Sequence, residues 1–196
     1  MSRNLLDALD GWNSVKSAEL YGIGAWGQGY FKVTEDGYVA VNLRNAKGTV
    51  SVKLCDIVNG IHDRGMGLPL LLRFSDLLGD RIRLINESFK KAITDYGYEN
   101  FYRGAFPIKV NQQQQAVHDV VTFGAPYHHG LEAGSKAELI AAIAYMRDPE
   151  AFLICNGYKD AEFIDLALSS IKMGLQTILV LETPDELDLI LGRAAA

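Results

Sequence analysis

The second half of the chain alternates short apolar runs with amphipathic stretches. Each run precedes a segment whose apolar residues recur at three- and four-residue steps; the runs are 127–133, 151–155 and 177–181. Short apolar runs are typical of buried strands, and the following period is typical of helices. Strands that alternate with helices, without hairpins, predict a parallel sheet with right-handed crossovers. From residue 109 onward we therefore expect an α/β fold.

The same alternation extends upstream. Residues 68–74 form an apolar run that predicts a strand, and the residues after Ser75 predict one amphipathic helix that ends at Gly97. Residues 101–111 predict a further strand. A closed (β/α)8 barrel needs eight βα units, and we count only about four or five. We therefore expect a partial TIM-type barrel in residues 68–196, truncated within or just after a βα unit.

Residues 1–67 predict a smaller β-rich or mixed region. Gly22, Gly24 and Gly27 satisfy the pattern G-x-G-x-x-G. That fingerprint of dinucleotide binding requires a strand before it and a helix after it. Here residues 30–41 predict a hairpin with an Asp-Gly turn, so we reject the dinucleotide hypothesis. Residues 52–61 show a short helical period.

The composition narrows the partners and the compartment. The net charge is −5, with 19 basic and 24 acidic residues and no basic block, which argues against nucleic-acid and anionic-membrane partners. We find neither a secretory signal nor an apolar run of membrane-spanning length. Cys55 and Cys155 form no Cys-x-x-Cys pattern, which favours free thiols in a reducing, cytoplasmic location. The four histidines show no zinc-type spacing with the cysteines.

Chemistry on a parallel barrel lies where the strands end. The residues at the predicted strand ends are Lys109, Asn111, Glu132, Ser135, Asn156 and Glu182. A lysine among apolar neighbours ionises less readily, and a neutral amine can condense with an aldehyde. Lys109 is therefore our candidate for holding pyridoxal phosphate. The alternative is a lysine whose ammonium simply reaches water.

Each of three further sites has two possible interpretations, one functional and one structural. Glu132, on the neighbouring strand, could hydrogen-bond Lys109 and orient the cofactor, or could be a rim carboxylate without a role. In residues 156–160 a turn and a helix N-cap explain Gly157 and Asp160, and the alternative for this segment is a resemblance to a strand-exit motif, which is given below. We expect His128 and His129 to be strand and rim residues with a satisfied hydrogen bond, with a substrate role as the alternative.

Several of these segments are similar to one family. Residues 106–113, Phe-Pro-Ile-Lys-Val-Asn-Gln-Gln, resemble the cofactor-lysine segment of the biosynthetic arginine decarboxylases, which are pyridoxal-phosphate enzymes of the alanine-racemase-like barrel class. Residues 21–31, 68–76, 131–136 and 156–160 are also similar to that family. The resemblance implies that Lys109 binds the cofactor covalently, and that Glu132 stands where related enzymes carry an acid. It also implies that the amino-terminal region packs beside the barrel.

The function implied by the resemblance is decarboxylation of L-arginine to agmatine in polyamine biosynthesis. A homo-oligomer in the full-length form and dependence on Mg²⁺ are further family expectations. The family's phosphate cradle and guanidinium-binding carboxylate have no match in these residues, so we expect a fragment that is inactive alone. The alternative is a truncated, non-catalytic chain that pairs with a full-length subunit or only binds cofactor. A compact single-barrel cofactor carrier is a third hypothesis, against which the predicted hairpin and the Lys109 segment argue.

Overall fold

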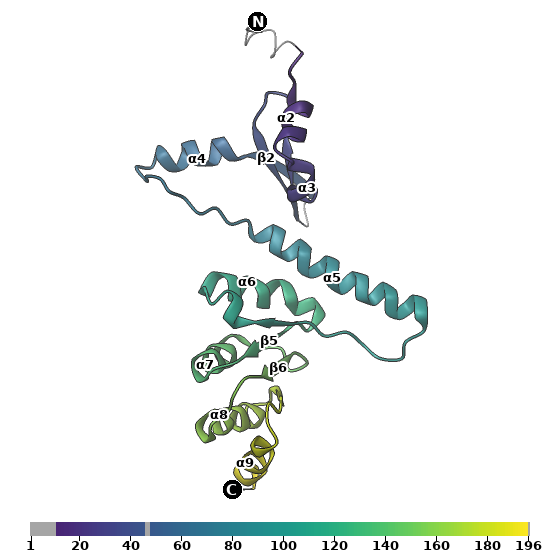
Figure 1. Ribbon diagram of the computed structural model, residues 1–196, viewed down its shortest axis with the longest axis vertical. Coiled ribbons are helices and arrows are strands. Elements are labelled where there is room, and N and C mark those ends of the chain that lie inside the picture. The colour runs from purple at the N-terminus through teal and green to yellow at the C-terminus, as the bar shows by residue number, and fades with distance from the viewer. Residues whose placement is uncertain (1–10, 46–47, 196) are drawn as a thin grey trace, which may run out of the picture. The chain divides into compact units, whose positions relative to one another are not determined.

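The chain forms two compact units, residues 1–77 and 78–196, in a computed structural model that describes residues 11–45 and 48–195. Helix α5, Ser75–Tyr96, begins in the first unit and continues into the second (Figure 1). The boundary expected between residues 67 and 68 lies in an irregular segment ahead of this helix. That domain boundary stays a prediction.

The first unit contains a three-stranded antiparallel sheet in the order β1-β2-β3. Helices α2 (Ser14–Leu20) and α3 (Ile23–Gly27) precede it, and helix α4 (Leu54–His62) follows it. The strands are β1 (Phe31–Val33), β2 (Val39–Asn45) and β3 (Gly48–Lys53).

The predicted hairpin is confirmed, since Phe31 pairs with Val41 across the turn that contains Gly37. Gly22 follows helix α2 rather than a strand, so the glycine pattern lacks the context that a dinucleotide site needs. The helix expected over residues 52–61 starts two residues later, because Val52 pairs with Val41 in the sheet.

The strand expected at residues 68–74 is wrong. Leu70, Leu72 and Phe74 are half-buried while Leu71 is 76% exposed, which is the alternation of an extended chain. No described strand pairs with this segment, however. A strand requires a ladder of hydrogen bonds to a neighbour, so an apolar alternating run without one stays irregular.

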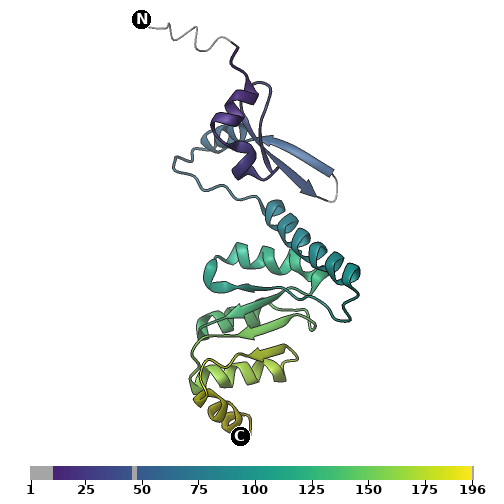
Figure 2. The same ribbon diagram turned by 45° about the vertical axis from the view of Figure 1, so that its right-hand side comes forward.

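The second unit is built on a parallel sheet in the order β4-β5-β6-β7. The strands are β4 (Ala105–Pro107), β5 (Gly130–Ala133), β6 (Phe152–Cys155) and β7 (Gln176–Leu179). Helices α6 (Gln114–Gly124), α7 (Lys136–Tyr145), α8 (Ala161–Lys172) and α9 (Asp185–Ala194) follow the strands in turn. Figure 2 shows these helices succeeding one another beside the sheet. The predicted repeat of strand and helix is confirmed.

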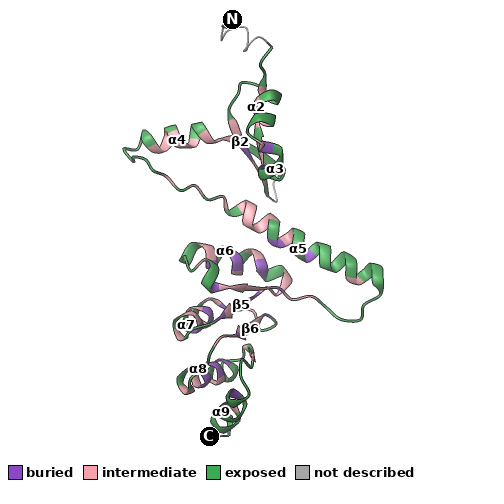
Figure 3. Ribbon diagram, viewed as in Figure 1, coloured by how far each residue is buried: buried purple, intermediate pink, exposed green. Residues whose placement is uncertain are grey.

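The core of the second unit lies between its strands and helices. Strands β5 and β6 contribute Leu131, Ala133, Leu153 and Cys155, each with no exposed surface. Helices supply the opposing layer, with Val117, Val120, Leu139, Ala142, Phe163 and Ala167. Figure 3 shows the buried residues, in purple, on the strands and helices of this unit. Burial of one such leucine stabilises the fold by about 1.5–3 kcal/mol, so this layer holds the strand ends in place.

Several predicted boundaries differ from the structure. The strand expected to reach residue 111 ends at Pro107, and the 3-10 turn η1, Ile108–Val110, follows it. The strand expected from Tyr127 begins at Gly130, after the 3-10 turn η2, Ala125–Tyr127. In both places an i+3 backbone hydrogen bond, from Asn111 to Ile108 and from His128 to Ala125, replaces the ladder.

The last two helices also depart from expectation. The order Thr183, Pro184, Glu186 predicts an N-cap at Thr183, but the N-cap of the ten-residue helix α9 is Pro184. On α8, the helical period that buries Phe163, Ile164 and Ala167 predicts a buried Ile171 as well, but Ile171 is 46% exposed. Ser170 is buried in its place, since its hydroxyl bonds the Ala167 carbonyl and the Thr177 hydroxyl.

Candidate active site

The carboxyl ends of the four parallel strands meet at one edge of the sheet. Lys109 lies in the turn directly after β4, and Glu132 is the third residue of β5. Asn156 follows β6 at once, and Glu182 follows β7. Parallel strands in register end at the same edge, which is where α/β folds place ligands. The predicted strand-end residues therefore converge.

Lys109 and Glu132 face each other across this edge. The Lys109 Nζ lies 3.6 Å from Glu132 Oε1, and the Lys109 side chain is 61% exposed. The expectation of apolar neighbours around the amine is thus not met by the described residues. The amine is instead accessible, and its neighbour is a carboxylate that is 19% exposed.

Glu132 belongs to a continuous set of contacts along the edge. Its Oε1 accepts a hydrogen bond of 3.3 Å from Asn156 Nδ2. The Gly157 N–H in turn donates to Asn156 Oδ1 and to Glu182 Oε1, both at 2.9 Å. The Glu132 carboxylate is therefore oriented by Asn156, which follows the neighbouring strand β6. A rim carboxylate without a role would not need such a contact.

Other predicted residues serve the backbone. Ser135 with Glu138 three residues later is the pattern of a capping box, and the Ser135 hydroxyl does cap α7 by accepting from Glu138 N at 3.3 Å. Glu138 Oε2, however, accepts from the Gly134 N–H rather than from that of Ser135. Asp160 caps α8, and Asn111 Oδ1 accepts from Gln113 N at 3.2 Å. These contacts account for Ser135, Asp160 and Asn111 without a ligand.

A buried ion pair behind the edge escaped the sequence analysis. The Lys159 side chain is fully buried, and its Nζ donates to Gly157 O at 2.6 Å and to Glu186 Oε2 at 3.0 Å. Glu186 also accepts from the N–H groups of Lys159 and Glu182, at 3.1 and 2.8 Å. The pair thus joins the two loops that carry Asn156 and Glu182.

The ionisation of Glu186 reflects two opposing effects. Burial would raise the pKa of this carboxyl, but hydrogen bonds from the Glu182 N–H and from Lys159 hold the pKa below its ordinary value. Glu186 is therefore a buried carboxylate. Glu186 lies on helix α9, where a charged side chain usually faces solvent. Its partner Lys159 is 27 residues away in the chain, so the local sequence pattern gives no signal for this contact.

The histidines lie away from this edge. His128 and His129 stand just before β5, at the amino end of the strands, so their expected strand position is wrong. His128 Nδ1 is 2.9 Å from Asp148 Oδ2, which confirms its expected hydrogen bond. His129 Nδ1 is buried and has no partner among the described residues, and burial lowers the pKa of this imidazole.

Two other searches of the described residues gave negative results. In residues 11–45 and 48–195, no group of three or more His, Cys, Asp or Glu side chains is arranged to hold a metal ion. None of the helices in the same ranges combines the length and the apolar character needed to cross a membrane.

An accessible lysine thus lies beside a fixed carboxylate at the carboxyl edge of a parallel α/β sheet, which is the edge where barrel folds bind ligands. Residues 82–195 match the family model described as pyridoxal-dependent decarboxylase, pyridoxal binding domain. The chain belongs to this family. The pyridoxal cofactor expected from the Lys109 segment is thereby confirmed at the level of the family.

Individual relatives carry a more specific name. The chain is 46% identical over 183 residues to the biosynthetic arginine decarboxylase of Gloeobacter violaceus, and 47% identical over 181 residues to that of a Nostoc species. These matches cover 93% and 92% of this chain but only 28% and 26% of the relatives. The chain therefore spans little more than a quarter of their length.

A solved structure agrees in fold. The crystal structure of the biosynthetic arginine decarboxylase SpeA from Campylobacter jejuni matches with a TM-score of 0.82 and 37% identity. The match covers 89% of this chain and 29% of that chain. The expected fold, a partial barrel preceded by a small β-rich region, is confirmed.

Proposed function

We propose that this chain forms the amino-terminal part of a pyridoxal-phosphate-dependent decarboxylase that converts L-arginine to agmatine. The observation that carries the proposal is the accessible Lys109 amine, presented after β4 at 3.6 Å from the Glu132 carboxylate. An exposed amine at the edge where α/β proteins bind ligands fits an aldehyde cofactor.

Three residues of the edge have a role in this proposal. Lys109 Nζ would hold the cofactor aldehyde carbon, and Glu132 Oε1 would hold a proton on that nitrogen. The Asn156 amide keeps the Glu132 carboxylate oriented through its 3.3 Å hydrogen bond. Pyridoxal phosphate, when bound, supplies the electron sink that decarboxylation requires. The protein supplies the position and the charge.

The finer parts of the proposal rest on different supports. Arginine as the substrate rests on the names of the relatives at 46% and 47% identity. A place in polyamine biosynthesis, a cytoplasmic location, a homo-oligomeric full-length form and dependence on Mg²⁺ rest on the family resemblance. The absence of nucleic-acid and membrane partners rests on the net charge of −5 and the lack of a basic block.

The test is covalent trapping. The chain is incubated with pyridoxal phosphate, reduced with borohydride and digested, and mass spectrometry then locates the phosphopyridoxyl group. We expect the adduct on Lys109 and its loss in Lys109→Ala. Lys172→Ala is the matched control, since it removes a lysine that lies at the end of α8, away from the strand edge. An adduct that is spread over many lysines, or unchanged in Lys109→Ala, contradicts the assignment of Lys109.

Turnover is a separate readout. Release of agmatine and carbon dioxide from arginine supports the full proposal. An adduct on Lys109 without turnover supports the alternative, in which the chain only binds cofactor or pairs with a full-length subunit.

A further inference from the structure

A pocket of about 480 Å³ lies at the opposite edge of the second unit from Lys109. Its walls come from helix α5, from residues 100–103 and from residues 126–128. The last two segments precede β4 and β5, whereas Lys109 follows β4. A cavity of several hundred Å³ is of the size that holds small-molecule ligands. The pocket is therefore separate from the proposed active site.

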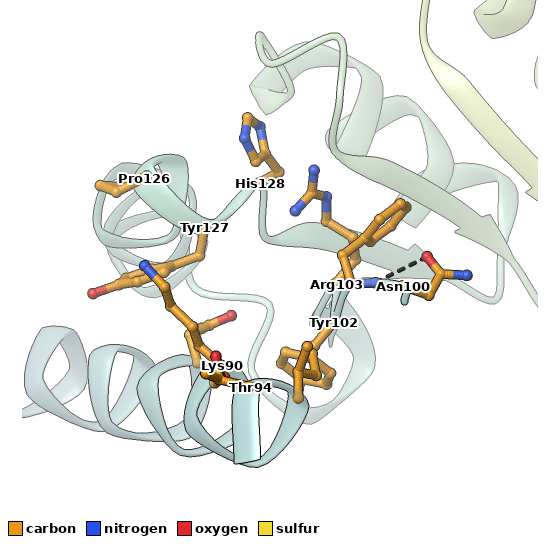
Figure 4. Close-up of a pocket in the computed structure, with 11 residues that line it drawn as sticks. Lys90, Thr94, Asn100, Tyr102, Arg103, Pro126, Tyr127 and His128 are labelled. Atoms are coloured by element: carbon orange, nitrogen blue, oxygen red, sulfur yellow. Dashed lines mark hydrogen bonds between the residues drawn. The ribbon is translucent and has the colours of Figure 1, made fainter. Parts of the chain in front are cut away.

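The charged groups of the pocket are cationic. Lys90 and Arg103 line it, and no carboxylate of the described residues is among the lining groups. Figure 4 shows Lys90 rising from its helix near Tyr127, with Arg103 and His128 approaching from the other side. The pocket thus presents positive charge from two directions.

The neighbouring acids pair with Arg103 and His128. Asp148 Oδ2 lies 2.9 Å from His128 Nδ1, and Glu150 Oε2 lies 3.2 Å from Arg103 Nη2 and 3.7 Å from His128 Nε2. The Arg103 Nε is buried without a hydrogen-bond partner, and Lys90 has no ion-pair partner among the described residues. Lys90 is therefore a charged donor at this pocket that is free to bind an anion.

Aromatic rings form the other walls. Tyr102 stacks on Phe89, with ring centroids 3.9 Å apart and planes inclined by only 6°. The Arg103 guanidinium lies over the Phe101 ring, 4.5 Å from its centroid. Tyr127 closes the far side. Fixed aromatic faces favour a flat ligand, because planar rings stack with little loss of conformational entropy.

We propose that this pocket binds a planar aromatic anion, a ring that carries a phosphate or a carboxylate, at a site remote from Lys109. The ring would lie among Phe101, Tyr102 and Tyr127, and the anionic group would contact Lys90 and Arg103. This site is additional to the proposed decarboxylase function and does not depend on it.

The test is calorimetric titration of the 196-residue chain. Adenosine 5′-monophosphate and 4-hydroxybenzoate are the probes for phosphate and carboxylate, with adenosine and inorganic phosphate as the separated parts. None of these probes has an aldehyde, so none can react with Lys109. We expect one of the two aromatic anions to bind saturably, more tightly than either adenosine or inorganic phosphate.

Adjacent lysines supply a matched pair of variants. Lys90→Ala removes a charge that lines the pocket, and Lys91→Ala removes one that pairs with Asp95 on α5. Both side chains are exposed, so both variants should fold. We expect affinity to fall about tenfold in Lys90→Ala and to stay within about twofold in Lys91→Ala and Lys109→Ala. No saturable binding of either aromatic anion, equal losses in Lys90→Ala and Lys91→Ala, or loss in Lys109→Ala would overturn the proposal.

Discussion

Gly157 stands where the loops of three βα units approach one another. Its φ is +78°, and a Cβ on this residue would lie 3.1 Å from the Gly134 carbonyl oxygen. Its N–H also holds Asn156 and Glu182 in place. A side chain here would be strained and would press on a backbone oxygen, so the geometry of the active-site edge depends on this glycine.

Left-handed backbone strain alone costs about 1–2 kcal/mol. We expect Gly157→Ala to lower the free energy of unfolding by more than this amount. Gly174→Ala is the matched control, because Gly174 has a φ of +92° with no atom within 4 Å of its Cβ position. Urea unfolding of both variants measures the difference. Equal losses would show that the contact with Gly134 does not matter.

The two cysteines should differ sharply in reactivity. Cys155 is fully buried in β6, and burial raises the pKa of its thiol to about 11, whereas Cys55 is exposed. Since the thiolate is the reactive form, we expect a disulfide reagent to titrate Cys55 alone in the folded chain and both thiols after denaturation. Cys55→Ser should abolish the fast reaction, and a fast reaction that persists in this variant would contradict the burial of Cys155.

At the scale of elements, the Lys159–Glu186 pair connects the loop after β6 to the first turn of α9. The Lys159 ammonium donates to the Gly157 carbonyl, and the Glu186 carboxylate accepts from the Glu182 N–H. The pair is therefore hydrogen-bonded to both loops at the strand edge. Removal of one partner would leave the other charge buried without compensation. The position of α9 relative to β6 depends on this pair.

We expect Lys159→Met to lower the free energy of unfolding by about 3 kcal/mol or more, measured by urea denaturation. The double variant Lys159→Met with Glu186→Leu should recover part of that loss, since it buries no charge. Lys136→Met is the control, because Lys136 is an exposed lysine that pairs with Asp160 and Glu162. A loss in Lys159→Met no larger than in this control would mean that the buried pair contributes little.

Elements with a strong local signal could be predicted from the sequence. Helix α5 ends at Tyr96 because Gly97 adopts a φ of +62°, and the capping-box pattern of Ser135 and Glu138 marks the start of α7. Residues 68–74 could not be predicted, since a strand needs a partner that no local pattern encodes. The same reason hid the burial of Lys159, whose partner stands 27 residues away.

The sequence predicted which residues form the candidate site, but it did not predict their exposure to solvent. Lys109, Glu132, Asn156 and Glu182 converge because parallel strands place their ends together. The exposure of Lys109 was not predictable, because it depends on where β4 stops and a turn begins. Sequence periodicity locates such boundaries only to within a few residues.

At the scale of the whole molecule, the division at residues 77 and 78 has a measurable consequence. Residues 63–74 form no helix or strand, and Arg64 and Arg73 are exposed within them. Exposed irregular segments close to the boundary of a compact unit are preferred sites of proteolysis. We expect trypsin to cut first after Arg64 or Arg73, and mass spectrometry of the early fragments identifies the site. A first cut within the parallel sheet would contradict the greater accessibility of residues 63–74.

The order β4-β5-β6-β7 places each strand beside the one that precedes it in the chain. A ribosome adds about 5–20 residues per second, so when each of the strands β5, β6 and β7 leaves the ribosome, the strand with which it pairs has already left it. No strand has to wait for a distant segment, and the short loops between neighbours keep the entropic cost of pairing low. This half of the molecule can assemble in the direction of its own synthesis.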